Sequence, residues 1–135
     1  MNLIICLDNN NGMGFAGRRQ SADRVLARHI LSFTANTKVW MSPHSAAFFG
    51  ESPDNFVFRQ TYWMDAGEQD YCFAEYDFPP EAIKLVRSII VYRWNRFYPA
   101  DRYFPAEELM KRSKRVGSEF SGSSHERITQ EIYSL

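Results

Sequence analysis

The sequence predicts a single α/β domain with a mainly parallel sheet, flanking helices and a C-terminal antiparallel hairpin. Apolar runs alternate with helical segments along most of the chain, which is typical of parallel sheets with helical crossovers. The C-terminal segment instead contains two strand-like runs around a Ser-Gly-Ser-Ser loop. A length of 135 residues with 44% hydrophobic residues fits one domain with one folded core.

The first strand–helix unit is the clearest. The apolar run over residues 2–7 predicts a buried strand, which ends at a turn-forming Asp-Asn-Asn-Asn-Gly segment. Ser21 is a good N-cap for a helix over residues 22–33. Within that helix Arg24 and Arg28 are four residues apart and therefore share an exposed face.

Later elements follow from the same signals. β-branched and aromatic runs predict strands, whereas proline and glycine mark their ends. The strongest strand signal is SIIVYRWN. The expected elements are a strand over 38–41, a short helix from Ser42 through Phe49, strands over 56–62 and 71–74, one or two helical turns over 81–86, a strand over 88–95, and hairpin strands over 113–119 and 126–133.

Composition narrows the function classes. No apolar run approaches the roughly 18–20 residues of a membrane span, and the N-terminus lacks the basic segment of a secretion signal, so we expect a cytoplasmic protein without a membrane partner. Cys6 and Cys72 lie within apolar runs and are expected to be reduced core residues. No metal site is expected, because the chain has no Cys-x-x-Cys motif and no histidine pair at helical spacing. The sequence leaves the oligomeric state open.

Charge is unevenly distributed although the net charge is zero. Residues 1–50 carry five basic and two acidic side chains, residues 51–81 one basic and eight acidic, and residues 82–135 ten basic and six acidic. Such blocks form solvated faces that attract one another, or they form a basic pocket for an anionic ligand. The arginines available for that pocket are Arg18, Arg19, Arg24, Arg28, Arg93 and Arg96.

Three stretches together resemble dihydrofolate reductase. The opening NLIICLDNNNGMG, followed by Ser21-Ala22-Asp23, is similar to that family's first strand, Gly-Met loop and first helix. Lys38-Val39-Trp40-Met41-Ser42-Pro43-His44-Ser45 is similar to its second strand and the following Gly-Arg-His-Thr. Residues 88–95, Pro99-Ala100-Asp101, Val116 to Phe120 and Ser124-His125 follow the order of its C-terminal strands.

This resemblance implies a dihydrofolate-reductase-like sheet that binds a small anionic or heteroaromatic ligand, nucleotide-like or pterin-like, between the first strand and the loop over 12–21. Asp23 would be the catalytic acid that addresses a ring nitrogen of the substrate. The alternative is that Asp23 is only an acid in the first turn of a helix, where the helix dipole favours it. The implied ligand-binding residues are Arg18, Arg19, Ser21, Cys6, His44 and Ser45.

Several departures weigh against a working reductase. The resemblance implies NADPH as cofactor, but Glu75-Tyr76 stands where the family has the glycine pair that admits the pyrophosphate. Pro43 replaces the arginine that reads the 2′-phosphate of NADPH, and Tyr92 replaces the threonine that partners the catalytic acid. Because fold does not carry activity with it, we expect ligand binding without established catalysis.

A second resemblance concerns short bacterial proteins that share NNGM and Arg-Arg-Gln-Ser-x-Asp and are labelled ribonuclease Z. That label implies two zinc ions on a His-x-His-x-Asp-His cluster, which His29, His44 and His125 cannot supply. A separate motif, Gly-x-Gly-x-x-Gly, is formed by Gly12, Gly14 and Gly17. It is interpreted either as a dinucleotide-binding loop or as a flexible lid or turn.

Two features remain open in the C-terminal half. His125 is an acid–base group or a hydrogen-bonded cap at a loop-to-strand junction. Arg93, Trp94 and Arg96 interleave cations with a ring, which is the composition of a surface that binds RNA, although packed rings under arginines produce the same pattern. The alternative function is therefore a non-catalytic RNA- or protein-interaction module.

Overall fold

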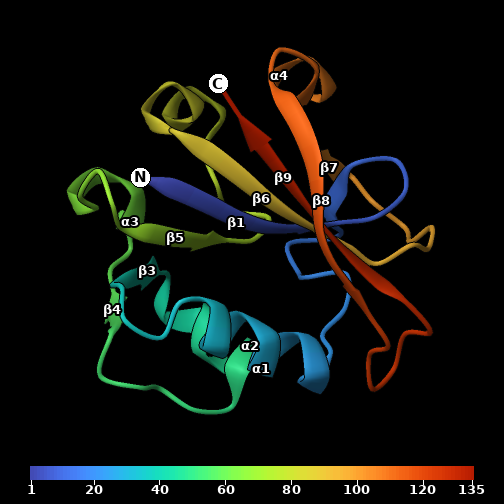
Figure 1. Ribbon diagram of the computed structural model, residues 1–135, viewed down its shortest axis with the longest axis horizontal. Coiled ribbons are helices and arrows are strands. Elements are labelled where there is room, and N and C mark those ends of the chain that lie inside the picture. The colour runs from blue at the N-terminus through green and yellow to red at the C-terminus, as the bar shows by residue number, and fades with distance from the viewer.

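The computed structural model describes residues 1–135 and contains a seven-stranded sheet in the order β4-β3-β5-β1-β6-β9-β8 (Figure 1). The strands from β4 to β6 are mutually parallel, whereas β9 runs antiparallel to both β6 and β8. The predicted α/β class, with a mostly parallel sheet and a C-terminal antiparallel pair, is confirmed. The strands of this sheet are β1 (Asn2–Leu7), β3 (Val39–Met41), β4 (Phe56–Phe58), β5 (Tyr71–Ala74), β6 (Ser88–Arg93), β8 (Ser113–Phe120) and β9 (Ile128–Ser134).

The central strand β1 is buried on both faces. Leu3, Ile5 and Leu7 belong to the apolar cluster on one side of the sheet, and Ile4 belongs to the cluster on the other. Successive side chains of a strand point to opposite faces, so a continuous apolar run fills both layers at once. Each of these four side chains is fully buried.

Helices cover both faces of the sheet. In Figure 1, α1 and α2 lie together below the sheet, where Leu26 and Ile30 of α1 pack in the second cluster. The other cluster takes Tyr62 of α3 and Leu109 of α4. The helices are α1 (Arg24–Phe33), α2 (Ala46–Phe49), α3 (Tyr62–Asp65) and α4 (Ala106–Met110), with 3₁₀ turns η1 (Pro43–Ser45) and η2 (Pro80–Leu85). None of these helices has the length and apolar content that a membrane span requires.

Several predicted boundaries differ from the structure, and one predicted loop contains a strand. The helix expected over 22–33 begins at Arg24, because Asp23 rather than Ser21 is its N-cap. The strand over 56–62 ends at Phe58, and Tyr62 begins α3. The strand over 88–95 ends at Arg93, because Asn95 adopts a left-handed φ of 58°. The glycine loop contains a strand, β2 (Gly12–Gly14), which pairs with β7 (Arg102–Tyr103).

Strand β8 closes one end of the sheet and pairs only with β9. Most of its residues are exposed, including Lys114 and Arg115, so one of its edges carries unpaired backbone groups. By contrast, β9 lies between β6 and β8 and is mostly buried. The hairpin therefore contributes one interior strand and one edge strand to the sheet.

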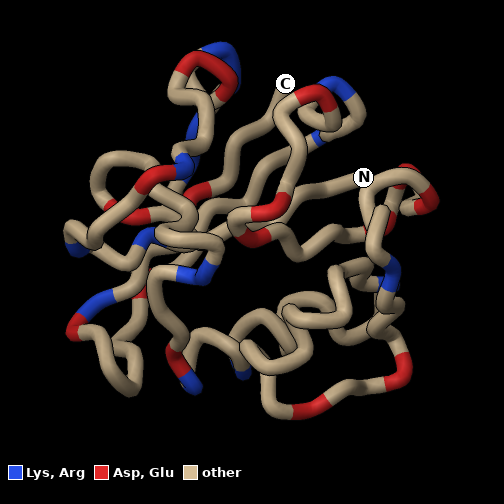
Figure 2. The backbone as a smooth tube through the Cα atoms, turned by 180° about the vertical axis from the view of Figure 1, so that it is seen from behind, with Lys and Arg blue, Asp and Glu red and all other residues tan.

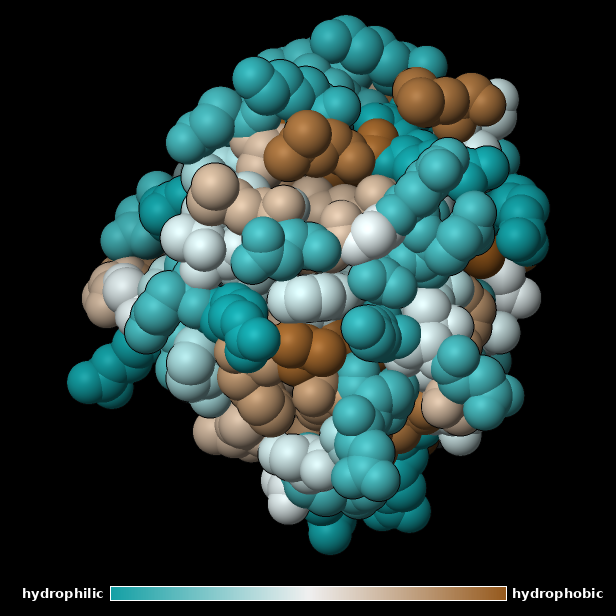
Figure 3. Space-filling view, turned by 90° about the vertical axis from the view of Figure 1, so that its left-hand side faces the viewer, coloured by the Kyte–Doolittle hydropathy of each residue, from teal (hydrophilic) through white to brown (hydrophobic).

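Surface charges of both signs are interspersed around the molecule (Figure 2). The acidic middle segment forms ion pairs with both basic flanks, through Arg19 with Glu75 and Arg87 with Glu68. The face at the left of Figure 1 likewise shows small apolar areas separated by hydrophilic side chains (Figure 3). The charge blocks of the sequence thus attract one another across the fold.

Candidate functional site

Asp23 is the N-cap of α1. Its φ of −152° and ψ of 128° are extended, and its Oδ1 accepts hydrogen bonds from the N–H groups of Val25 at 2.9 Å and Leu26 at 3.1 Å. This is how an aspartate satisfies the first free donors of a helix. Asp23 therefore has a structural role as the cap of α1.

The same carboxylate also holds the β8–β9 loop. Oδ1 accepts from the N–H of Ser123 at 3.0 Å, and Oδ2 accepts from the N–H of Ser124 at 2.9 Å. His125 Nδ1 lies 3.0 Å from Oδ2, and Asp23 and His125 are each only 3% exposed. One buried group thus fixes both the start of a helix and a loop one hundred residues away.

The pKa of Asp23 reflects two opposing effects. Burial alone raises the pKa, because it disfavours the charged form. Hydrogen bonds from Ser123, Ser124, His125 and Leu26 outweigh burial and hold the pKa well below the usual aspartate value. Asp23 is therefore a permanently ionised carboxylate, which is unsuited to donate a proton near neutral pH.

His125 uses its other ring nitrogen to reach two hydroxyl groups. Nε2 lies 2.7 Å from the Tyr98 hydroxyl and 3.3 Å from Ser21 Oγ. Trp94 stacks on the imidazole with ring centroids 4.4 Å apart. Because ionised Asp23 can only accept, Nδ1 donates in this contact, and in the neutral imidazole Nε2 is then the acceptor for a hydroxyl group.

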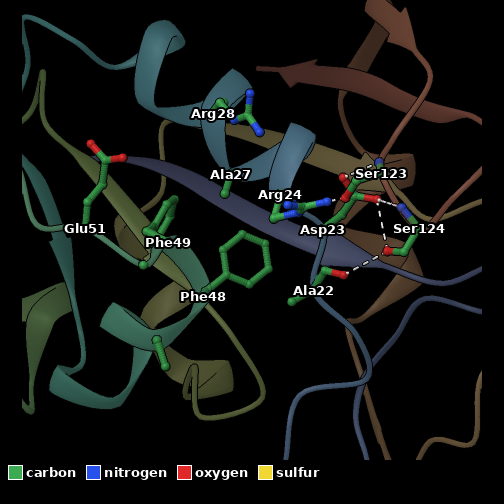
Figure 4. Close-up of a pocket in the computed structure, with 12 residues that line it drawn as sticks. Ala22, Asp23, Arg24, Ala27, Arg28, Phe48, Phe49, Glu51, Ser123 and Ser124 are labelled. Atoms are coloured by element: carbon green, nitrogen blue, oxygen red, sulfur yellow. Dashed lines mark hydrogen bonds between the residues drawn. The ribbon is translucent and has the colours of Figure 1, made fainter.

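A cleft of about 570 Å³ lies beside Asp23, between α1 and α2 (Figure 4). We call it the α1–α2 cleft. Arg24 and Arg28 are exposed, and neither guanidinium forms an ion pair or hydrogen bond within the chain. The cleft is lined by Ala22, Asp23, Arg24, Ala27, Arg28, Ala47, Phe48, Phe49, Gly50, Glu51, Ser123 and Ser124.

Arg19 lies in a different place and is not free. Its Nε donates to Glu75 Oε1 at 2.7 Å and its Nη2 donates to Oε2 at 3.0 Å. Ser45 Oγ donates to the same Oε2 at 2.8 Å, and His44 Nε2 lies 3.8 Å from it. The donors expected to hold a phosphate therefore surround an internal carboxylate, Glu75, which is 7% exposed.

The pocket predicted between the first strand and the glycine loop is nearly filled. Only about 10 Å³ remains among Cys6, Arg19, Ser21, Glu75 and their neighbours, roughly the space of one water molecule. We call it the inner pocket. Burial, assisted by Glu75 and opposed by Arg19, raises the pKa of Cys6 well above its usual value, so this thiol is protonated there.

Arg18 lines a third, open hollow of about 450 Å³, together with Arg19, Gln20 and Tyr98. The structure therefore does not bring Arg18, Arg19 and Asp23 into one cluster. Arg18 and Arg19 share the third hollow, and Arg19 also borders the inner pocket, whereas Asp23 lies at the α1–α2 cleft with the free cations Arg24 and Arg28.

The predicted exposed surface of Arg93, Trp94 and Arg96 does not form. Trp94 is 2% exposed because its ring stacks on His125. Arg93 donates from Nε to Glu131 at 2.8 Å and from Nη1 to Asn11 at 2.6 Å. Only Arg96 remains exposed, so the three side chains cannot bind one strand of RNA together.

The glycine motif is also built differently from a dinucleotide loop. Gly12 donates its N–H to Asp8 Oδ1 at 2.8 Å, and a side chain at Gly14 would meet Tyr76. Helix α1 begins at Arg24, ten residues after Gly14, so its N-terminus does not follow the motif directly. The glycines serve close packing and the β2–β7 pair.

Sequence reasoning missed Tyr98, Phe48 and the two serines Ser123 and Ser124 as parts of these sites. The one sequence signal for Ser124 is its position next to His125, which was a candidate residue. Compared with models of known protein families and with curated proteins, the chain matches none of them.

Proposed function

We propose that the protein binds a small anionic, heteroaromatic ligand, nucleotide-like or pterin-like, in the α1–α2 cleft. The observation that carries this proposal is the pair of uncommitted cations, Arg24 and Arg28, on the wall of a cleft of about 570 Å³. Arginine binds phosphate and carboxylate groups in a planar, two-pronged geometry. Ligand pockets of small molecules commonly have volumes of this order.

The opposite wall supports a ring-bearing ligand. Phe48 and Phe49 come from α2 and face α1 across the cleft (Figure 4). Both rings are largely buried, at 6% and 7% exposed, so they offer a small apolar contact to the ring of a ligand, whereas the two arginines would hold its anionic group. Glu51 also lines the cleft, and its negative charge disfavours a ligand that carries negative charge along its whole length.

We also propose that the fold is a shortened dihydrofolate-reductase-like one. A mainly parallel sheet with an antiparallel end, and a loop followed by a helix after the first strand, support this. Glu75 beside Arg19 and the small inner pocket favour binding without NADPH-dependent reduction. The proposed role is therefore recognition rather than established catalysis.

Thermal unfolding with NADPH, folate, purine mononucleotides and a short RNA tests the proposal. A ligand that binds only the folded state raises the melting temperature. We expect one of the small anions to raise it, and Arg24→Ala/Arg28→Ala to remove the shift. The matched control is Arg96→Ala/Arg115→Ala, which removes two exposed arginines outside the cleft.

Three results would overturn the proposal. The first is that no small molecule stabilises the folded state at millimolar concentration. The second is that a ligand does so equally well without Arg24 and Arg28. The third is stabilisation by RNA alone, which would favour a nucleic-acid-binding protein.

A further inference from the structure

We propose that Ser21, His125 and Asp23 form a nucleophile–base–carboxylate triad that hydrolyses small esters. This activity differs from ligand binding in the α1–α2 cleft, because Ser21 and His125 do not line that cleft and only Asp23 is common to both sites. The order of contacts is that of a serine hydrolase: a hydroxyl on Nε2 and a carboxylate on Nδ1 of one histidine. Such a centre is recognised by geometry and not by sequence position.

The distances support each link. Ser21 Oγ lies 3.3 Å from His125 Nε2, within the range of catalytic contacts before substrate arrives. His125 Nδ1 lies 3.0 Å from Asp23 Oδ2, and both of these side chains are inaccessible to solvent. Ser21 is only half-buried, so the group that must meet a substrate is the exposed member.

The imidazole is held in one orientation. Trp94 covers one face of the ring at 4.4 Å, and Asp23 is fixed by the N–H groups of Ser123 and Ser124. A base that is locked before the reaction loses little entropy when the nucleophile is activated. Preorganisation of this kind is what distinguishes a reactive triad from a chance contact.

Tyr98 provides a second hydrogen-bond arrangement. Its hydroxyl lies 2.7 Å from Nε2 and 3.4 Å from Ser21 Oγ, so it can donate to either. When Tyr98 donates to Ser21, the serine hydroxyl is free to donate to Nε2. Tyr98 thus competes with Ser21 for the base in one arrangement and supports the serine in the other.

The proposed reaction balances without any added cofactor. Ser21 Oγ attacks the ester carbonyl while its proton moves to His125 Nε2, and the imidazolium is stabilised by Asp23. The C–O bond to the alcohol breaks, and His125 returns the proton to the departing alkoxide. Water then attacks the acyl-serine with His125 again as base, which releases the carboxylic acid and restores Ser21.

The surroundings of Ser21 define where a substrate would lie. Ser21 borders the inner pocket of about 10 Å³, which has room for no more than one water molecule, so the acyl group of a substrate would lie on the solvent side of Ser21. The backbone N–H groups of Ser21 and Ala22 make no hydrogen bond within the chain and precede the positive end of α1. Free N–H groups there are suited to a developing oxyanion.

The test uses diisopropyl fluorophosphate, with the modified residue located by mass spectrometry of the folded full-length chain. We expect one adduct, on Ser21, and slow hydrolysis of p-nitrophenyl acetate. Ser21→Ala should remove both, and Asp23→Asn or His125→Gln should slow labelling by roughly 10²–10⁴-fold. Ser52→Ala is the control, since Ser52 is an exposed serine outside this network.

Tyr98→Phe guards against loss of fold, because it keeps the ring and removes only the competing hydroxyl. We expect labelling of Ser21 to be faster in this variant than in the parent protein, because the hydroxyl that lies 2.7 Å from His125 Nε2 no longer competes for the base. Three results would overturn the proposal: no adduct on the folded protein, an adduct on Tyr98 or another serine instead, or loss of Ser21 labelling in folded Tyr98→Phe. None of these bears on ligand binding between α1 and α2.

Discussion

His125 Nδ1 lies 3.0 Å from Asp23 Oδ2, although the two residues are 102 positions apart in the chain. The contact joins the first turn of α1 to the loop between β8 and β9. Asp23 can cap α1 locally through Val25 and Leu26, but its bonds to Ser123, Ser124 and His125 form only with the C-terminal hairpin. A contact of such long sequence separation slows folding relative to local contacts.

Acid should destabilise the protein through Asp23. In the unfolded chain an aspartate binds a proton near pH 4, whereas folded Asp23 has a lowered pKa and stays ionised. The unfolded state then binds more protons, so this contribution is complete above about pH 4 and is lost progressively as pH falls below it. Urea unfolding between pH 7 and pH 3 measures the slope. Asp23→Asn should flatten it, and an unchanged slope would contradict the role given to Asp23.

Gly122→Ala should disrupt the same network without removing a charged group. A Cβ at Gly122 would collide with Oδ2 of Asp23, which is held by several hydrogen bonds and cannot move away. We expect the free energy of unfolding to fall by about 1–3 kcal/mol, as for other overpacked sites. Gly67→Ala is the control, because a Cβ there lies 3.2 Å from the half-buried side chain of Asp70, a contact that a small shift relieves. Equal stability losses in the two variants, by denaturant titration, would refute the prediction.

Arg19→Ala should destabilise the fold by about 2–4 kcal/mol, because it leaves buried Glu75 without its cation. Adding Glu75→Gln should recover part of the loss, since glutamine is neutral and can still accept from Ser45. A double-mutant cycle measures this coupling. Arg87→Ala is the comparison, because its exposed pair with Glu68 contributes at most about 1 kcal/mol. Strictly additive losses for Arg19 and Glu75 would argue against the pair.

Both cysteines should resist alkylation in the native state. Burial raises the pKa of Cys72 to about 12 and that of Cys6 well above its usual value, and the thiolate is the reactive form. Iodoacetamide at pH 8 should label the folded protein far more slowly than the protein in concentrated guanidinium chloride. Rapid labelling of either native cysteine would show that its surroundings open on the timescale of the reaction.

The sequence predicted the elements whose signal is local. The strands over 2–7 and 71–74 have the bounds expected from their apolar runs. The helical turn over 62–65 was missed because aromatic residues such as Tyr62 and Trp63 favour strands, and packing of Tyr62 in the core decides otherwise. Helix α4 was missed because a helix of five residues is too short to show a helical periodicity of apolar residues.

The candidate site was only partly predictable. Asp23 was identified, but the alternative role, an acid in the first turn of a helix, is not quite what the structure has, because Asp23 is the N-cap before the first turn of α1. Ser21 and Asp23 are equally good N-caps by type, and the choice falls on Asp23 because His125 and the β8–β9 loop reach it in space. Pairings such as Arg19 with Glu75 depend on strand order, which no single segment specifies.

The position of β8 has a consequence for how the molecule behaves at high concentration. A long strand with a free edge is a template on which other chains can stack into fibrils. Lys114, Arg115 and Glu119 place charges along that edge, so a second molecule would have to desolvate them before its backbone could join. These side chains act as gatekeepers against self-assembly, and their neutralisation would convert the border of the sheet into a nucleation site.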